Sequence, residues 1–226
     1  TDVTDRERYR EELERQNERL EQFASLVSHD LRNPLTVATG HFELLREDVE
    51  IEADNDHAEA VERALTRMDN LIEQILTLTR DGRPVDQWDA VLLSSVVREC
   101  WEMVETSTAE LHFNNDLTFK ADEARLQRLF ENLFRNALDH GGPDVTVTVG
   151  SLPDRPGFYV ADDGPGIPED DRESVFTPGY TTREEGTGFG LAIVSEMVAA
   201  HGWEIQVTES EAGGARFEIF GVETVA

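Results

Sequence analysis

The segment Phe-Ala-Ser-Leu-Val-Ser-His-Asp-Leu-Arg-Asn-Pro-Leu, residues Phe23–Leu35, decides how the first part of this chain folds. Its apolar residues recur every three or four positions, which predicts an amphipathic helix. His29 lies two residues from both Val27 and Leu31, roughly 200° around such a helix from each. The pattern therefore places His29 on the polar face beside Asp30, where a nucleophile, a metal ligand and an ordinary surface histidine all remain open.

Heptad-like spacing extends this helix toward the N-terminus. The intervals alternate between four and three, with glutamate and arginine between them, so a coiled-coil linker is predicted over residues 1–19. Pro34 has no N–H and crowds the carbonyl of Asp30, so a bend near His29 is expected. The heptad-like residues are Tyr9, Leu13, Gln16, Leu20, Phe23 and Val27.

A second periodic run follows an acidic break at residues 47–56. Two such helices joined by a loop form a hairpin, which we assign to residues 20–82, and Asp81-Gly82-Arg83-Pro84 ends it. A monomeric two-helix arm fits the pattern, but we favour a dimeric four-helix bundle because the coiled coil also needs a partner. The second run consists of Val61, Ala64, Met68, Leu71, Ile75 and Leu78.

Beyond the hairpin, over residues 83–226, helical periodicity and strand-like alternation are mixed. The fold class predicted for the chain is therefore α+β, a helical hairpin followed by an α/β sandwich. The expected helices cover about residues 92–106, 122–139 and 190–201, and the expected strands cover Val145–Val149, Phe158–Ala161, Glu204–Thr208 and Ala215–Phe220.

Acidic residues dominate the charge of the chain. Its 226 residues carry a formal net charge of −28, and the basic residues are 19 arginines and a single lysine, Lys120. This distribution argues against a nucleic-acid partner and resembles the surfaces of proteins from salt-adapted cells, where salt screens the self-repulsion.

Cysteine usage and hydropathy indicate whether disulfides, thiolate metal sites or membrane spans are to be expected. Cys100 is the single cysteine, so no disulfide or thiolate metal cluster is expected, and its apolar neighbours favour a buried structural thiol. No apolar run approaches the ~18 residues needed to cross a bilayer. We expect no membrane contact from this segment and a cytoplasmic location, with the full-length protein soluble or anchored upstream.

A helix expected near residues 121–140 carries polar residues on one face. Arg128, Asn132, Asn136 and His140 follow strict i, i+4 spacing opposite an apolar face. Asparagine is unfavourable inside a helix, so two on one face suggest a function. An amide oxygen suits Mg²⁺, which takes few protein ligands and completes its shell with phosphates and water.

Two glycine-containing turns follow. Asp162 ends a predicted strand before Gly164 and Gly166, and an ordinary turn and a base-binding carboxylate are about equally compatible with that pattern. The glycine-rich segment Glu185–Val194 opens a helix, where free N–H groups can bind an anion. Its spacing matches neither a P-loop nor a dinucleotide fingerprint.

Taken together, these motifs resemble the catalytic core of two-component sensor histidine kinases, over about residues 20–220. Asp163 departs from the asparagine that many members of that family have. Residues 1–6 resemble the exit of a PAS sensor domain, which implies a sensor domain upstream. The matching boxes are 28–35 (phosphoacceptor), 131–140 (asparagine), 162–166 and 186–190 (glycine) and 175–182 (phenylalanine).

The resemblance implies a homodimerising phosphotransfer hairpin at residues 20–82 and a Bergerat-type ATP-binding domain at residues 83–226. His29 would take the γ-phosphate of ATP and pass it to a response regulator receiver domain. Asp30 would orient the histidine ring and accept its proton, and Asn33 would position water for dephosphorylating the regulator.

The resemblance also implies a nucleotide site. Asn136 would bind Mg²⁺, Asp162 would accept the N6 amine of adenine, and Phe176 would anchor a mobile lid over about residues 168–185. The residues implied to bind the nucleotide are Asn132, Asn136, Asp162, Gly164, Gly166, Phe176, Gly186, Gly188, Gly190 and Leu191.

Alternatives to an autophosphorylating kinase remain at this point. A mismatch-repair, chaperone or topoisomerase-like ATPase would lack the histidine hairpin. A non-catalytic dimerising signalling module would not need His29, Asp30, Asn136 and Asp162. A phosphatase-dominant enzyme stays open because of Asp30 and Asn33. The metal-ligand hypothesis for His29 is disfavoured, because no second histidine or carboxylate cluster shares its face.

Overall fold

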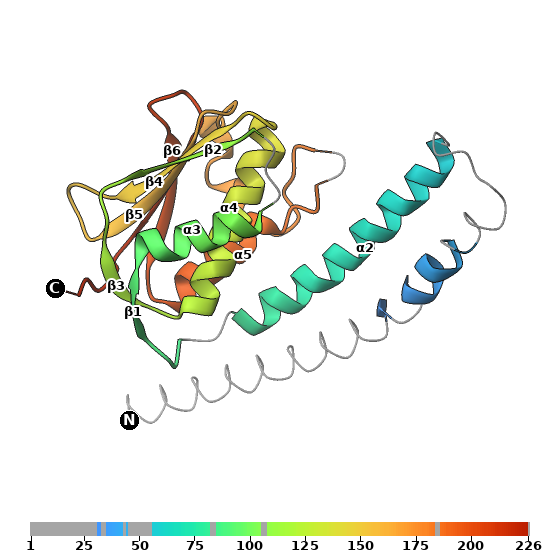
Figure 1. Ribbon diagram of the computed structural model, residues 1–226, viewed down its shortest axis with the longest axis horizontal. Helices are drawn as coiled ribbons and strands as arrows, with labels where there is room; N and C mark the ends of the chain where they lie inside the picture. Colours follow the sequence, from blue (N-terminus) through green and yellow to red (C-terminus); the bar gives the residue numbers. More distant parts are fainter. Residues whose placement is uncertain are drawn as a thin grey trace, which may run out of the picture. The chain divides into compact units, whose positions relative to one another are not determined.

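The computed structural model describes residues 31–32, 35–42, 44, 56–81, 85–104, 108–183 and 186–225 (Figure 1). These residues divide into two compact units, within Thr1–Arg80 plus Arg183–Thr187 and within Asp81–Thr182 plus Gly188–Ala226. His29, Asp30, Asn33, Pro34 and the coiled-coil segment 1–19 lie outside the described residues, so the expectations placed on them stay predictions.

In the first unit, α2 (Asp56–Asp81) is the second helix of the predicted hairpin. It ends at Asp81, where the sequence predicted its end. Residues 31–32, 35–42 and 44 are also helical, and the Arg32 Nε atom lies 3.5 Å from Asp69 Oδ1 on α2. Ala58 and Ile72 are buried on α2, whereas Val61 and Met68 of the predicted seam are exposed in the single chain.

The second unit is built on a five-stranded sheet in the order β2-β4-β5-β7-β6. The edge pair β2–β4 is parallel and the other pairs are antiparallel. The strands are β2 (Glu110–Asn114), β4 (Thr146–Ser151), β5 (Gly157–Asp162), β6 (Glu204–Glu209) and β7 (Ala215–Phe220).

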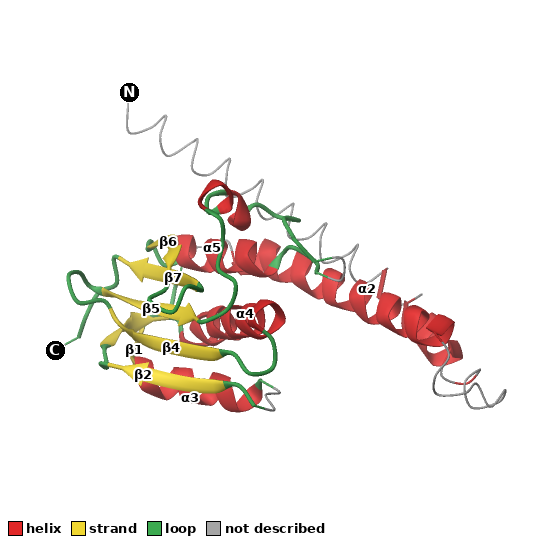
Figure 2. Cartoon of the chain, turned by 90° about the horizontal axis from the view of Figure 1, so that it is seen from above, coloured by secondary structure: helices red, strands yellow, loops and turns green. Residues whose placement is uncertain are grey.

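Three helices cover one face of this sheet: α3 (Leu93–Met103), α4 (Glu123–Gly141) and α5 (Gly190–Ala200) (Figures 1 and 2). Phenylalanine side chains fill the space between the layers, and the Phe158 ring lies 5.4 Å from that of Phe130 and 5.5 Å from that of Phe119. Burial of such large apolar rings is the main stabilising contribution to this α/β sandwich.

Cys100 is fully buried on α3, as predicted for a structural thiol. Burial, followed by the charges of Glu131 and Glu99, raises its pKa to about 12. The thiol is therefore protonated and unreactive at neutral pH.

A small second sheet pairs β1 (Asp89–Leu92) antiparallel with β3 (Thr118–Ala121). The C-terminal segment extends it, since Phe119 bridges Thr224 and the Lys120 N–H donates to the Glu223 carbonyl at 2.9 Å. The Lys120 Nζ atom also lies 2.6 Å from Glu223 Oε1.

The α+β class is confirmed, and the four predicted strands and three predicted helices of the second unit all form within a few residues of their expected bounds. Strands β1, β2 and β3 were not predicted; β1 and β3 form the small sheet, and β2 is an edge strand of the large one. In α5, Leu191 is half-buried, and Ala192 and Ile193 beside it are buried.

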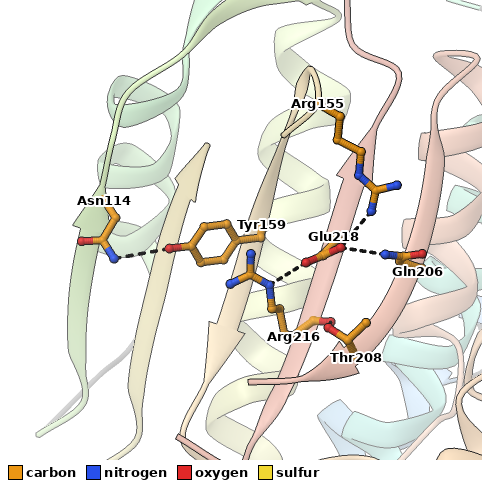
Figure 3. Close-up of polar contacts among 7 residues, drawn as sticks. All are labelled: Asn114, Arg155, Tyr159, Gln206, Thr208, Arg216 and Glu218. Carbon is orange, nitrogen blue, oxygen red and sulfur yellow. Dashed lines mark hydrogen bonds and ion pairs between the residues drawn. The ribbon is translucent and has the colours of Figure 1, made fainter. Parts of the chain in front are cut away.

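The other face of the five-stranded sheet carries a polar cluster, shown in Figure 3. Glu218 accepts hydrogen bonds from Arg216 (2.7 Å), Arg155 (2.9 Å) and Gln206 (2.7 Å). The Arg216 guanidinium stands 3.7 Å above the Tyr159 ring. The cluster partly covers the open sheet face without adding another layer of secondary structure.

Among the described residues, no helix is both long and apolar enough to cross a membrane.

Candidate functional site

Asp162 is the last residue of β5, and its carboxylate is held by two backbone groups. Oδ1 accepts the N–H of Gly164 at 2.9 Å and that of Ala215 at 3.1 Å. Oδ2 accepts no hydrogen bond within the described part of the chain. One carboxylate oxygen is thus fixed, and the other is left with its acceptor capacity unused.

The electrostatic setting of Asp162 is mixed. Burial raises the pKa of its carboxyl, against the lowering effect of the Ala215 and Gly164 N–H groups, while the Asp163 charge raises it further and His140 lowers it. The free oxygen Oδ2 is not fully enclosed, so a donor from solvent or from a ligand can reach it. That combination is typical of ligand-binding positions.

Helix α4 presents the predicted polar face. Asp122 caps its N-terminus, accepting the Arg125 N–H at 3.1 Å, and the expected apolar face is buried. Asn132 Nδ2 donates to the Arg128 carbonyl one turn earlier, at 2.8 Å, which leaves its Oδ1 as the free end of the amide. The half-buried Asn136 amide has no hydrogen-bond partner among the described residues.

Close backbone approach brings the end of α4 to the turn after Asp162. A Cβ added to Gly164 would lie 3.1 Å from the Gly141 Cα atom and 3.0 Å from Asp162 Oδ1. A side chain at residue 164 would therefore crowd the contact between this turn and the C-terminal end of α4. The contact places Asp162 near the half of the helix that carries Asn136.

The N-terminus of α5 approaches the same face of α4. A Cβ on Gly190, the first residue of α5, would lie 3.5 Å from Asn132 Oδ1. No side chain hydrogen-bonds to cap this helix end. The first N–H groups of α5 have no helical acceptor, so they form an anion-binding end beside Asn132.

Gly188 allows the segment before α5 to fold against the preceding loop. Its φ is +73°, and an added Cβ would lie 2.8 Å from the Tyr180 carbonyl oxygen and closer still to Gly179. Gly186 groups with the first unit instead.

Phe176, implied by the resemblance to anchor the lid, lies at the end of a short 3-10 helix. In the short 3-10 helix η2 (Ser174–Phe176), Val175 is the buried residue that packs toward α5, and Phe176 is half-buried. The anchoring role of Phe176 stays a prediction.

No group of three or more histidine, cysteine or acidic side chains that could hold a metal ion occurs among the described residues. A metal bound at Asn136 would therefore take most of its ligands from elsewhere. That is the usual situation for Mg²⁺ with a nucleotide.

The structure adds a part of the site that the sequence did not predict: the turn Ser210–Gly214 between β6 and β7. The Ser210 hydroxyl donates to the Asp162 carbonyl oxygen at 2.7 Å, and Ala215, directly after the turn, donates its N–H to Oδ1. A serine before a Gly-Gly pair indicates a tight hairpin, but nothing in the sequence says which distant residue that hairpin touches.

Family models match two separate parts of the chain. Residues 121–223 match the Histidine kinase-, DNA gyrase B-, and HSP90-like ATPase family, so the α/β sandwich and its site define an ATPase domain of that class. Residues 19–84 match the His Kinase A (phospho-acceptor) domain. With both domains in this order, the chain belongs to the sensor histidine kinases.

Individual relatives agree with this assignment. The chain is 31% identical over 208 residues to the sensor histidine kinase ZraS of Salmonella typhi, covering 87% of this chain and 44% of the relative. It is 32% identical over 228 residues to the methanogenesis regulatory histidine kinase FilI of Methanothrix harundinacea, covering 94% and 26%. The chain therefore spans less than half of the length of these two relatives.

A solved structure gives the same result for the fold. Full-length ShkA in complex with AMPPNP has a TM-score of 0.70 and 27% identity, covering 91% of this chain and 46% of that one. The chain also resembles the mycobacterial sensor histidine kinase MprB, with a TM-score of 0.54 and 26% identity, covering 62% of this chain and 100% of that one.

Proposed function

We propose that this chain phosphorylates itself on His29 with ATP and then transfers the phosphoryl group to an aspartate of a response regulator receiver domain. The imidazole nitrogen of His29 attacks the γ-phosphorus, the bond to the β-phosphate oxygen breaks, and ADP leaves. Asp30 accepts the proton of the ring. Removal of phosphate from the regulator, with Asn33 positioning the water, is a second activity of the same surface.

The observation that carries this proposal is the convergence of unused polar groups around α4. Asp162 Oδ2 and the Asn136 amide have no partners among the described residues, and the uncapped start of α5 lies beside Asn132. A nucleotide supplies what these groups lack: an exocyclic amine for the carboxylate and phosphate oxygens for the helix N-terminus.

The donor set also fits a magnesium ion. Asn136 offers an amide oxygen at a half-buried position without another partner in the described chain, and Mg²⁺ commonly takes one or two protein ligands. When bound, the ion would neutralise charge on the phosphates. Asn132, one turn away on the same face, would orient the phosphates beside Gly190.

A homodimer accounts for the exposed apolar side chains of the helical unit. Two of these residues, Val61 and Met68, belong to the predicted seam of the second helix. A four-helix bundle made with a second copy would cover exposed apolar residues of this kind. The exposed residues are Leu31, Val37, Leu44, Val61 and Met68.

The proposed function also includes regulation by a sensor domain and a cellular location. A sensor domain, PAS-like by the resemblance of residues 1–6, would set the kinase activity of the dimer. Consumption of ATP and transfer to a receiver domain place the proposed reaction in the cytoplasm.

The experiment is incubation of the chain with γ-labelled ATP and Mg²⁺ at several salt concentrations. Wild type is expected to gain a label that is labile in acid and stable in base, and His29→Ala is expected to gain none. His41→Ala is the matched control, because His41 is an exposed histidine in the first helical region of the same unit and should leave labelling unchanged. Addition of a receiver domain should then remove the label from the chain.

Label persisting in His29→Ala would overturn the assignment of the phosphoacceptor. Loss of label in His41→Ala as well would show that the assay reports on the integrity of the helix. Absence of label at every salt concentration, with ATP binding intact, would favour the non-catalytic signalling module.

A further inference from the structure

The β6–β7 turn, Ser210–Gly214, is built around the backbone and side chain of Asp162. Ser210 is buried, with 8% of its surface exposed. Its hydroxyl donates to the Asp162 carbonyl oxygen at 2.7 Å and accepts the Gly214 N–H at 2.9 Å. Both capacities of one hydroxyl are therefore used to join this turn to the end of β5.

The same turn is closed by its own backbone. Ser210 N–H donates to the Gly214 carbonyl at 2.8 Å, and Gly213 N–H donates to the Ser210 carbonyl at 3.0 Å. Residue 215 follows directly, so closure of the turn fixes where its N–H group lies. That N–H is one of the two donors to Asp162 Oδ1.

Glycine is required where the turn touches Asp162. A Cβ on Gly214 would lie 2.5 Å from Asp162 Oδ1 and closer still to its carbonyl oxygen. Gly166, at φ +73°, approaches from the other side, since a Cβ there would lie 2.9 Å from the Gly213 carbonyl oxygen. The turn and the segment after Asp162 are thus in direct backbone contact.

We propose that Ser210 is a positioning residue for base recognition: by joining the turn to β5 it holds the Asp162 carboxylate with Oδ1 on the backbone and Oδ2 free for the 6-amino group of a purine. The inference rests on the proposed nucleotide site and deepens it. Without the hydroxyl, the Ala215 N–H is no longer held against Oδ1, and the carboxylate can rotate. Selectivity for a 6-amino purine then falls, while contacts to the sugar and phosphates remain.

The test compares two ligands that differ only at C6: ADP, and purine riboside 5′-diphosphate, which has hydrogen in place of the amine. Isothermal titration with Mg²⁺ gives the ratio of their dissociation constants, analogue over ADP. Loss of one neutral hydrogen bond corresponds to about a fivefold effect on affinity, so Ser210→Ala should lower the ratio about fivefold by weakening ADP binding alone. Ser210→Thr, which keeps the hydroxyl, should restore the ratio to within about twofold.

Thr208→Val is the matched control in the same hairpin. The Thr208 hydroxyl donates to the Arg216 carbonyl at 3.5 Å on the open sheet face (Figure 3), and among the described residues it makes no hydrogen bond to Asp162. The ratio of the two dissociation constants in Thr208→Val should equal that of wild type. Ser210→Cys, which keeps the side-chain size but offers only a weak donor, should lower the ratio in the same direction as Ser210→Ala and serves if the alanine variant does not fold.

The outcomes distinguish failure of the positioning role of Ser210 from failure of the proposed nucleotide site. An unchanged ratio in the Ser210 variants, or parallel weakening of both ligands, overturns the positioning role and leaves only a structural one. A wild-type ratio of one, or no binding of either ligand, contradicts the nucleotide site itself. A lowered ratio in Ser210→Ala with recovery in Ser210→Thr supports the proposal.

Discussion

The two ends of α4 use polar groups in opposite ways. At the N-terminal end, His201 is buried, its Nε2 accepts the Asp122 N–H at 3.1 Å, and its Nδ1–H donates to the Met197 carbonyl at 2.7 Å. The ring stacks on Trp203 at 4.2 Å and meets the edge of Trp88 at 5.5 Å. Each polar atom of the imidazole has a protein partner.

Two polar groups near the C-terminal half of the same helix have no such partner. The Asn136 amide and Asp162 Oδ2 have no hydrogen-bond partners in the described chain, although both side chains are partly buried. Neither group is fully enclosed, so a ligand entering from solvent can complete the hydrogen bonding of both. Mutations at the first end are therefore expected to change stability, and mutations at the second end are expected to change binding.

The largest expected effect is on binding, from Asp162→Asn. The asparagine oxygen can still accept the Gly164 and Ala215 N–H groups, but its NH₂ then meets the purine amine donor to donor. Loss of a hydrogen bond to a charged group should weaken ATP about 100-fold in titration calorimetry, with little change in thermal midpoint.

Asp163→Asn is the control for that substitution. Asp163 Oδ1 accepts the Thr146 N–H at 2.8 Å, and asparagine can do the same. ATP affinity should stay within about twofold of wild type. Equal losses in the two variants would mean that charge around the turn, rather than the Asp162 oxygen, determines binding.

The next largest effect is on stability, from His201→Phe at the paired end. Phenylalanine keeps the ring stacking but leaves the Asp122 N–H buried without an acceptor, which should cost about 2 kcal/mol in the free energy of unfolding. ATP binding should be unchanged once the domain is folded. A variant as stable as wild type would contradict the comparison between the two ends.

The pH dependence of stability is a second test of the role of His201 at the N-terminal end of α4. Burial lowers the pKa of His201 below its ordinary 6.5, aided by Arg125 and opposed by the Met197 carbonyl and by Asp122. Below pH 6.5 the unfolded state therefore binds more protons, so stability falls as pH decreases through that range, by at most about 1.4 kcal/mol per pH unit. Urea unfolding between pH 7.5 and 5 should show this slope in wild type and a smaller one in His201→Phe.

A smaller effect on binding is expected from Gly190→Ala at the start of α5. The added methyl finds only ordinary contact with Asn132, at 3.5 Å, so the thermal midpoint should not fall. It would stand where a phosphate approaches the first N–H groups, and ATP affinity should drop about tenfold. Adenosine, which has no phosphate, should bind wild type and variant equally, and an equal loss for adenosine would place Gly190 away from the phosphates.

Periodicity was enough to predict much of this architecture. The hydrophobic pattern has a period of 3.6 residues along α4, which carries Asn132 and Asn136. It has a period of 2 along the strand that leads to Asp162. Both periods can be recognised from local sequence. The short edge strand β2 and the two strands of the small sheet depend on neighbours far along the chain, so local pattern did not reveal them.

Contacts across the site were beyond the reach of local pattern. Ser210 touches Asp162 across 48 positions of sequence, and His201 touches Asp122 across 79. Each residue is ordinary in its own segment, and its role exists only through a partner brought near by the sheet. Burial also separated Val175 from Phe176, because a 3-10 turn directs successive side chains to different sides.

The smallest expected effect comes from Glu218→Gln, on the sheet face that carries neither end of α4. The amide keeps one acceptor oxygen but turns its NH₂ toward donors from Arg155, Arg216 or Gln206, which should cost about 1 kcal/mol of stability. These donors hold the pKa of Glu218 below its ordinary value although its burial acts to raise it, so its contribution is present at neutral pH and is lost as pH falls below about 4.5. Thr208→Val on the same face should match wild type in urea unfolding at pH 7, and ATP affinity should be unchanged in both variants. A loss of ATP affinity in Glu218→Gln would show that the open face of the sheet is coupled to the site at α4, which no contact between the described residues predicts.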